Sequence, residues 1–247
     1  MADNEPEAVQ VHKSSDGITT ITINREHRRN AIDGPTARKL TDAFLVFEND
    51  PTQKVCVFYG AHGTFCAGFD IHEVAQYGHG FRDSSYKGSI IDDRLELSVL
   101  GDIRVAEETA VFGVFCRRFG VPLIDGGAVR LQAVVGLGRA LDMILTGRGV
   151  STEEALHMGL ANRVVPKGQA LAEATNIARQ LLAVPQACMN TDRTSCYYSA
   201  YNARSFEDAL SNEFNEGIKV INTESVRGAS EFSNGAGRHG SFEKAKI

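Results

Sequence analysis

The stretch Gly63-Thr64-Phe65-Cys66-Ala67-Gly68-Phe69-Asp70-Ile71 links a short apolar strand, expected over residues 55–59, to the start of a helix. A glycine-bearing turn between a strand and a helix directs backbone N–H groups toward a ligand. No nucleophile stands at the apex and no lysine follows the glycines, so neither a nucleophile elbow nor a phosphate-binding P-loop is indicated. The turn predicts a backbone donor site for a developing oxyanion, with an ordinary strand-to-helix connection as the alternative.

Further motifs follow one another along the chain in a fixed order. They are Ile21-Thr22-Ile23-Asn24-Arg25 with Asn30-Ala31-Ile32, the run 65–71, the run 95–106, Phe112-Gly113 with 126–131, and 145–148 with 155–166. Together they resemble the enoyl-CoA hydratase/isomerase family, the crotonases, from about residue 17 to residue 240. Glu26 stands where that family usually has a proline.

The strand and helix patterns predict an α/β fold that ends in helices. Isoleucine and threonine alternate over residues 18–23, as in a strand with two unlike faces. Asp33 and Pro35 suit the start of a helix that ends at Asp50-Pro51. Strands alternate with helices up to about Val165, and only helices follow.

The resemblance implies a crotonase-type spiral of repeated β-β-α units over residues 1–166 and a helical C-terminal trimerisation region over residues 167–247. Amphipathic helices are expected at 169–183 and 204–220. The second of these carries an apolar stripe, which predicts core packing or a subunit contact rather than a cofactor site. The stripe consists of Phe206, Leu210, Phe214 and Ile218.

Composition disfavours several classes of function. The 247 residues are 43% hydrophobic and 23% charged, which is ordinary for a soluble globular protein. A net charge of −5 disfavours nucleic-acid binding, and no apolar run approaches the ~20 residues that span a bilayer. The five scattered cysteines and the histidines lack metal-ligand spacing, so we expect thiols in a reducing compartment and no metal site.

The two ends of the chain bear on location. Residues 1–7 resemble neither a secretory signal nor a mitochondrial presequence, so we expect a cytoplasmic protein. Ala245-Lys246-Ile247 is a loose variant of the Ser-Lys-Leu peroxisomal targeting signal, so a peroxisomal location is the alternative.

One departure from the family pattern lies between Ile71 and Leu95. The family's Lys-Pro strand and glycine-rich turn are missing, so the stretch between residues 75 and 94 is about 15 to 20 residues short. The missing glycines would have supplied the second oxyanion donor, whose loss typically costs about 10²–10³ in kcat. The chain is a splice or gene-prediction variant, a degenerate non-catalytic member, or one that rebuilds a shorter strand at residues 88–91. The first is favoured because the motif resumes intact at Leu95.

The resemblance also implies where an acyl-CoA thioester binds. The N–H of Phe69 would hydrogen-bond the thioester carbonyl, so that an enolate could form at the α-carbon. Gly68 would let the ligand approach the backbone. The flanking residues that would line the substrate are Ala67, Gly68, Asp70 and Ile71.

A second group of residues would contact the coenzyme A part of the substrate. Asn30 and Ala31 would lie along the pantetheine. His27, Arg28 and Arg29 would meet the nucleotide phosphates electrostatically, with a solvated loop as the alternative for each.

Hydratases of this family use two glutamates to place and polarise one water. Glu96 aligns with the first, with a helix-terminal charge as the alternative. Cys116 stands at the second position, and a neutral thiol cannot easily replace a carboxylate base. Asp125, on a loop that passes the substrate in relatives, is the preferred second acid/base, with a turn-forming role as the alternative.

The resemblance therefore implies an acyl-CoA enzyme of enoyl-CoA hydratase/isomerase type, a lyase of fatty acid metabolism. Coenzyme A would enter as part of the substrate, with no metal or redox cofactor. A homotrimer or dimer of trimers is expected, with neither nucleic acid nor membrane as partner. The shortened segment predicts weak activity or none. The alternative is a non-catalytic crotonase-like subunit or truncated isoform that acts in hetero-oligomers.

Overall fold

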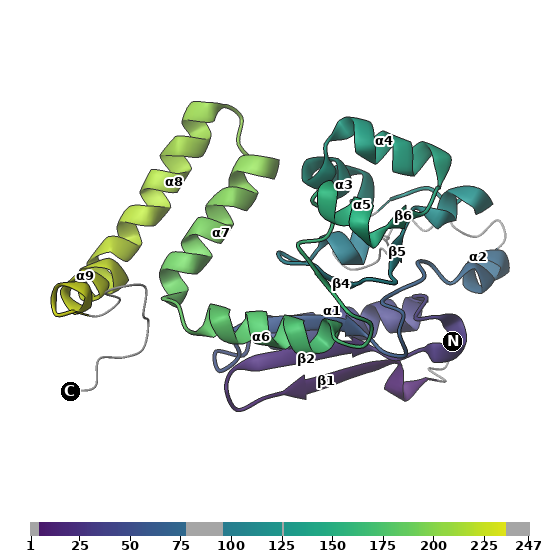
Figure 1. Cartoon of the computed structure of the whole chain (residues 1–247), viewed down its shortest axis with the longest axis horizontal. Helices are drawn as coiled ribbons and strands as arrows, with labels where there is room; N and C mark the ends of the chain where they lie inside the picture. Colours follow the sequence, from purple (N-terminus) through teal and green to yellow (C-terminus); the bar gives the residue numbers. More distant parts are fainter. Residues whose placement is uncertain (1–4, 78–95, 125, 236–247) are drawn as a thin grey trace. The chain divides into compact units, whose positions relative to one another are not determined.

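The computed structural model describes residues 5–77, 96–124 and 126–235 (Figure 1). The chain divides into two compact units, Met1–Leu181 and Leu182–Ile247. This division falls later than residue 166, where the sequence places the boundary, because most of one further helix belongs to the first unit.

That helix is α6 (Ala170–Leu182), which matches the amphipathic helix expected at 169–183. Ala178 on its inner face is buried. The guanidinium Nε of Arg179 lies 3.9 Å from Asp16 Oδ2 near the start of the chain. These contacts explain why α6 groups with the α/β part of the protein.

Strand β2 (Ile18–Ile23) is the centre of a three-stranded sheet. β1 (Val9–Lys13) pairs with it antiparallel, and β3 (Val55–Gly60) pairs with it parallel on the other side. Ile21 and Ile23 are buried and Thr20 and Thr22 are half-buried, so the predicted alternation is confirmed over residues 20–23. At the start of the strand it fails, because Thr19 is as buried as its neighbour Ile18 and donates to Gln53 Oε1 at 2.9 Å.

Helix α1 (Gly34–Glu48) crosses from β2 to β3. The side chain of Asp33 accepts a hydrogen bond from Thr36 N at 2.9 Å, and Pro35 occupies the first turn. This confirms the predicted start of the helix, since an Asp cap satisfies an amide that the helix itself cannot pair.

The first core lies between this sheet and α1. Phe58 of β3 packs edge-to-face against Phe44 of α1 and against Phe65, with ring centroids 5.2 and 5.1 Å apart. The buried members are Ile21, Ile23, Ile32, Ala37, Leu40, Ala43 and Leu97.

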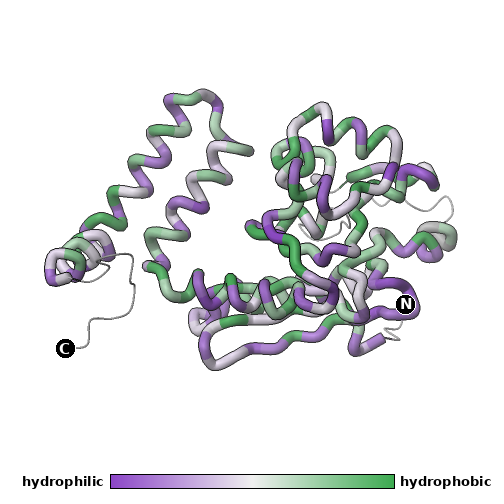
Figure 2. Tube along the Cα trace, viewed as in Figure 1, coloured by the Kyte–Doolittle hydropathy of each residue, from purple (hydrophilic) through white to green (hydrophobic). Residues whose placement is uncertain are grey.

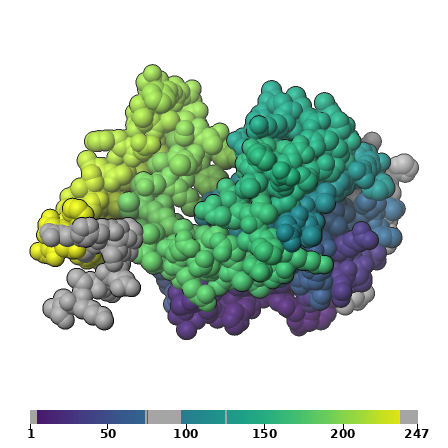
Figure 3. Space-filling model, in the orientation of Figure 1, coloured from purple at the N-terminus to yellow at the C-terminus, as the bar shows by residue number. Residues whose placement is uncertain are grey.

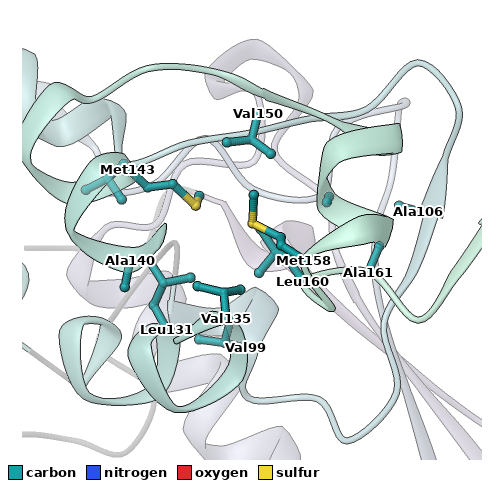
Figure 4. Packing of buried hydrophobic residues seen from close by; sticks show 12 residues of the cluster. Val99, Ala106, Leu131, Val135, Ala140, Met143, Val150, Met158, Leu160 and Ala161 are labelled. Carbon is teal, nitrogen blue, oxygen red and sulfur yellow. The ribbon is translucent and has the colours of Figure 1, made fainter. Parts of the chain in front are cut away.

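The second core belongs to the later part of the first unit (Figure 4). Two small sheets frame it: β4 (Val105–Glu107) pairs parallel with β7 (Arg163–Val165), and β5 (Val111–Phe112) antiparallel with β6 (Val150–Ser151). The helices are η5 (Phe115–Phe119), α3 (Gly127–Val135), α4 (Leu137–Thr146) and α5 (Thr152–His157). Ser151 Oγ accepts from Glu154 N at 3.2 Å and caps the start of α5.

One short turn contributes to both cores. The 3-10 helix η4 (Glu96–Val99) buries Leu97 in the first core and Val99 in the second. Leu97 and Val99, which are separated only by Ser98, therefore belong to different clusters. Shorter elements complete the unit: η1 (Pro6–Ala8), η2 (Glu26–Arg28) and α2 (Ile71–Tyr77).

The second unit is entirely helical in its described part. α7 (Gln186–Tyr201) and α8 (Phe206–Val220) pack side by side, and a π-helical turn η6 (Ile221–Ser225) leads into α9 (Val226–Ser233) (Figures 1 and 3). α8 confirms the helix expected at 204–220. The four side chains of its predicted apolar stripe are exposed in the single chain, and green segments mark hydrophobic residues along α8 in Figure 2.

Among the described helices, none combines the length and the apolar character that crossing a bilayer requires.

A pair of leucines on α1 tests the first core. Leu40 is fully buried and Leu45 is 49% exposed, so the same Leu→Ala change removes very different amounts of buried surface. We expect Leu40→Ala to lower the free energy of unfolding by about 2–5 kcal/mol, and Leu45→Ala by about 0.5 kcal/mol. Urea unfolding measures both, and equal losses would contradict the assignment of Leu40 to the core.

Candidate active site

The turn after β3 folds back closely on the end of that strand. A Cβ on Gly60 would lie 2.3 Å from the carbonyl oxygens of Thr64 and Phe65, so only glycine fits there. Gly68 has φ of 96°, a left-handed conformation that favours glycine. The predicted order of strand, glycine-bearing turn and helix is confirmed, with α2 starting at Ile71.

Phe69 lies beside Ile32 in an isolated parallel β-bridge. The Ile32 amide donates to the Gly68 carbonyl at 2.9 Å, and the Asp70 amide donates to the Ile32 carbonyl at 2.9 Å. In a trans peptide the C=O and the N–H of one unit point to opposite sides. The bond to the Gly68 carbonyl therefore directs the Phe69 N–H away from Ile32.

Asn30 holds the beginning of the turn. It is fully buried, and its Nδ2 donates to the carbonyls of Ala61 at 2.8 Å and Thr64 at 2.6 Å. Its Oδ1 accepts from the Arg25 amide at 2.7 Å. The φ of Asn30 is 59°, a left-handed value that asparagine tolerates better than most residues. The side chain that the sequence assigns to the pantetheine contact thus makes three hydrogen bonds within the protein.

Arg25 holds the end of the turn and is only 2% exposed. Its Nη1 donates both to the Ala31 carbonyl and, at 3.3 Å, to Asp70 Oδ2. Its Nη2 lies 2.8 Å from Asp33 Oδ2. A charged group at this depth requires such partners, because an unpaired buried charge is strongly unfavourable.

Glu5 completes the cluster around Arg25. Its carboxylate accepts from Arg25 Nε at 2.8 Å and from Nη2 at 3.1 Å. These hydrogen bonds from Arg25 lower the pKa of Glu5 below its ordinary value. The segment before β1 is therefore tied to the same guanidinium as the turn.

The structure brings several predicted site residues together along two adjacent backbone segments. Ala31 is buried and follows Asn30 on one segment; Ala67, Gly68 and Phe69 lie on the other. The Ala67 amide donates to the Arg29 carbonyl at 3.1 Å, next to the Ile32–Phe69 bridge.

The predicted substrate contact Asp70 lies inside the protein. Its carboxylate is buried beside Arg25, and its Oδ1 accepts from the His72 amide at 3.1 Å at the start of α2. Ile71, the first residue of α2, is 40% exposed. Asp70 is thus built into the support of the turn, whereas Ile71 lies at the surface.

The predicted phosphate contacts lie around the same cluster. Arg28 Nε is 3.7 Å from Asp70 Oδ2 and the side chain is partly exposed. His27 is more exposed and its Nε2 is 3.3 Å from Glu5 Oε1. Arg29 is exposed and has φ of 51°. All three residues border the segment that contacts the turn.

The structure describes the predicted acid/base residues only in part. The backbone of Glu96 begins η4, but its side chain lies outside the description, as does all of Asp125. Cys116 belongs to η5, is half-buried and packs against the second core. The stretch at residues 78–94 and the last residues, Ala245-Lys246-Ile247, also lie outside the described residues.

Within the described ranges, no group of three or more His, Cys, Asp or Glu side chains is arranged to hold a metal ion.

Sequence reasoning gave no role to Arg25 or Glu5 and assigned Asn30 and Asp70 to substrate contacts. A weak signal was present: Arg25 follows the buried strand β2 after a single residue, Asn24, and the acidic residue Asp33 lies eight positions further on. Only the folded structure reveals that these charges meet.

Replacement of Asn30 by alanine tests the support of the turn. Asn30→Ala leaves two carbonyls and one amide without their partner and places alanine at a positive φ, so we expect the free energy of unfolding to fall by roughly 3 kcal/mol. Asn49→Ala removes one exposed hydrogen bond to Leu45 O and should cost about 0.5 kcal/mol. Urea unfolding of both variants measures the difference, and a small loss in Asn30→Ala would contradict the bonding described here.

Glu5 predicts an acid dependence of stability. Because its pKa is lower when folded than its ordinary value of 4.5, its stabilising effect is present above that value and is lost as the pH falls through the folded pKa. Glu5→Gln should therefore destabilise the protein at pH 7, and its difference from the unaltered chain should shrink as the pH falls below 4.5 toward the folded pKa. Urea midpoints at pH 7 and below pH 4.5, with Glu48→Gln as an exposed control, check this. A difference that is constant with pH would exclude it.

Comparison with known proteins identifies relatives. A family model described as enoyl-CoA hydratase/isomerase matches residues 13–93 and 84–203. The enoyl-CoA hydratase EchA19 of Mycobacterium tuberculosis is 36% identical over 182 residues, covering 64% of this chain and 68% of the relative. The carnitinyl-CoA dehydratase of Salmonella typhi is 30% identical over 194 residues, covering 70% of this chain and 74% of the relative.

Solved structures share the architecture. The crystal structure of the enoyl-CoA hydratase from Bacillus anthracis matches with a TM-score of 0.81 at 22% identity, covering 92% of this chain and 96% of that chain. The enoyl-CoA hydratase EchA1 from Mycobacterium marinum matches with a TM-score of 0.81 at 24% identity, with the same coverage. The predicted crotonase-type α/β fold with a helical C-terminal region is therefore confirmed, and the chain belongs to the enoyl-CoA hydratase/isomerase family.

Proposed function

We propose that this protein binds an acyl-CoA thioester at the turn 61–70 and acts by hydratase/isomerase-type enolate chemistry. The observation that carries the proposal is the Ile32–Phe69 bridge in a chain of this family, because the bridge fixes the plane of the peptide that contains the Phe69 N–H and turns this N–H away from Ile32. The names of the relatives, enoyl-CoA hydratase and carnitinyl-CoA dehydratase, support the same chemistry.

In this proposal the Phe69 N–H donates to the thioester carbonyl of the substrate. As a proton leaves or joins the α-carbon, negative charge grows on that oxygen, and a donor already in place stabilises it without reorganisation. The effect is larger in the transition state than in the ground state, which is what accelerates the reaction. Ala67 and Gly68 line the acyl part, and Ala31 lies along the pantetheine.

The coenzyme A phosphates would meet a cationic rim. His27, Arg28 and Arg29 all lie on the segment next to the turn, and Arg28 and Arg29 always carry charge. Coenzyme A enters as part of the substrate, and the proposed chemistry uses no metal or redox cofactor. Asp70 supports the turn rather than the ligand, since its carboxylate is buried against Arg25.

Glu96 is the proposed first acid/base and Asp125 the second. Both assignments rest on where these residues stand in the motifs of the family. Cys116, which replaces the family's second glutamate, packs against the second core and supplies no carboxylate. In this pair, Glu96 and Asp125 would transfer protons to and from the substrate and water. The surroundings of each carboxyl group would set its pKa for that role.

We also propose that the shortened segment weakens turnover. The family match falls into two pieces that meet at residues 84–93. The alignment with EchA19 spans 182 positions but includes only 64% of the 247-residue chain, so some aligned positions have no counterpart here. Both observations support an internal deletion that would remove the second oxyanion donor.

The exposed stripe on α8 supports assembly into a homotrimer or a dimer of trimers, because large exposed apolar faces usually mark protein contacts. The second candidate function is that of a non-catalytic subunit that assembles with full-length relatives. The shortened segment supports it, because a chain without the second oxyanion donor could still contribute to an oligomer. We propose a cytoplasmic location, with the peroxisome as the alternative.

Thermal unfolding and a hydration assay test binding and turnover separately. Acetoacetyl-CoA at about 100 times its Kd should stabilise the folded chain by about 2.7 kcal/mol and raise the unfolding midpoint, whereas acetate should not. Hydration of crotonyl-CoA should be on the order of 10²–10³ slower than that by EchA19, because one donor is missing.

The two measurements fail in different ways. An unchanged midpoint with acetoacetyl-CoA would reject the binding proposal. Turnover equal to that of EchA19 would leave binding intact and reject the impairment. Co-purification with a longer relative, together with inactivity of the isolated chain, would favour the non-catalytic subunit.

A further inference from the structure

We propose that Arg25 is a positioning residue, which sets the direction of the Phe69 N–H by joining the two backbone segments of the Ile32–Phe69 bridge. This inference rests on the proposed function, since it assigns a role in orienting the oxyanion donor. Arg25 itself does not touch the substrate in this account.

One nitrogen atom of Arg25 contacts both backbone segments. Arg25 Nη1 donates to the Ala31 carbonyl, just before Ile32, and to Asp70 Oδ2, just after Phe69. The same atom therefore connects the residue preceding one side of the bridge with the residue following the other. Nη2 extends the connection to Asp33 Oδ2 at 2.8 Å, on the far side of Ile32.

These hydrogen bonds fix the direction of the Phe69 N–H as well as the distance between the two backbone segments. The Phe69 N–H lies in the peptide plane whose carbonyl accepts from Ile32 at 2.9 Å. If residues 31–33 and 70 slide or rotate past one another, that plane turns and the N–H turns with it. Displacement of a donor by about 1 Å can cost on the order of 10²-fold in rate.

Only arginine meets these demands. Its planar guanidinium presents five donors in a fixed fork, and Arg25 uses them on Ala31, Asp33, Asp70 and both oxygens of Glu5. A lysine has three donors around a single nitrogen and cannot reach partners on opposite sides. Arg28 does not substitute, because its Nε is 3.7 Å from Asp70 Oδ2 and its side chain is partly exposed.

Two variants separate orientation from stability. Arg25→Lys keeps the positive charge but loses the planar, forked set of guanidinium donors. Asp70→Asn keeps the Oδ1 acceptor for His72 N and loses the charged contact with Arg25. Arg104→Lys is the matched control, because Arg104 also binds several carbonyls, among them Leu160 at 2.7 Å and Gly101 at 2.8 Å, within the same unit.

The readout is the carbonyl stretching frequency of bound butyryl-CoA, labelled with carbon-13 at the thioester and measured by infrared difference spectroscopy. A hydrogen bond from the Phe69 N–H weakens the C=O bond and lowers this frequency. We expect Arg25→Lys and Asp70→Asn to lose most of the shift while binding butyryl-CoA with similar affinity. Arg104→Lys should keep the shift, even if its unfolding midpoint falls as far.

Each other outcome decides against a stated claim. A full shift in folded Arg25→Lys and Asp70→Asn overturns the positioning role. Loss of cooperative unfolding in both variants but not in Arg104→Lys also overturns it, because the cluster would then serve folding alone. Butyryl-CoA that binds the unaltered protein without a shift, or fails to bind, rejects the proposed function itself.

Discussion

The Ile32–Phe69 bridge is the constraint on which the candidate site depends. Two backbone hydrogen bonds, each 2.9 Å long, hold residues 68–70 beside residue 32. Because the working group is a main-chain amide, its direction cannot be set by its own side chain. It must instead be set by everything that fixes the backbone on either side, which explains why buried polar side chains gather there.

Stability and positioning have different sources in the first unit. Apolar burial in the two cores supplies the main driving force for folding. The cluster of Arg25, Asn30, Asp33 and Asp70 lies at the edge of that core, and buried ion pairs often add little net stability. Their directional bonds instead select one conformation of the turn among the many that a compact loop could adopt.

Much of the fold could be predicted from local pattern. The isoleucine and threonine pattern over residues 18–23, the cap at Asp33 and the turn at 63–71 each specify an element through nearby residues alone, and the structure contains the strand, the helix start and the turn. The roles of Arg25 and Asp70 could not be predicted in this way. They are 45 positions apart in sequence, and a charged residue looks the same whether it faces solvent or a buried partner. The grouping of α6 with the first unit was equally hidden in the sequence, since the contact between Arg179 and Asp16 joins distant parts of the chain.

The 3-10 turn η4 has a wider consequence. Leu97 and Val99 anchor separate apolar clusters, yet only Ser98 lies between them. Displacement of one cluster would strain the backbone that anchors the other, so this link favours opening of both clusters together over opening of one alone. A shared element of this kind raises the free energy of partly unfolded forms in which only one cluster is lost.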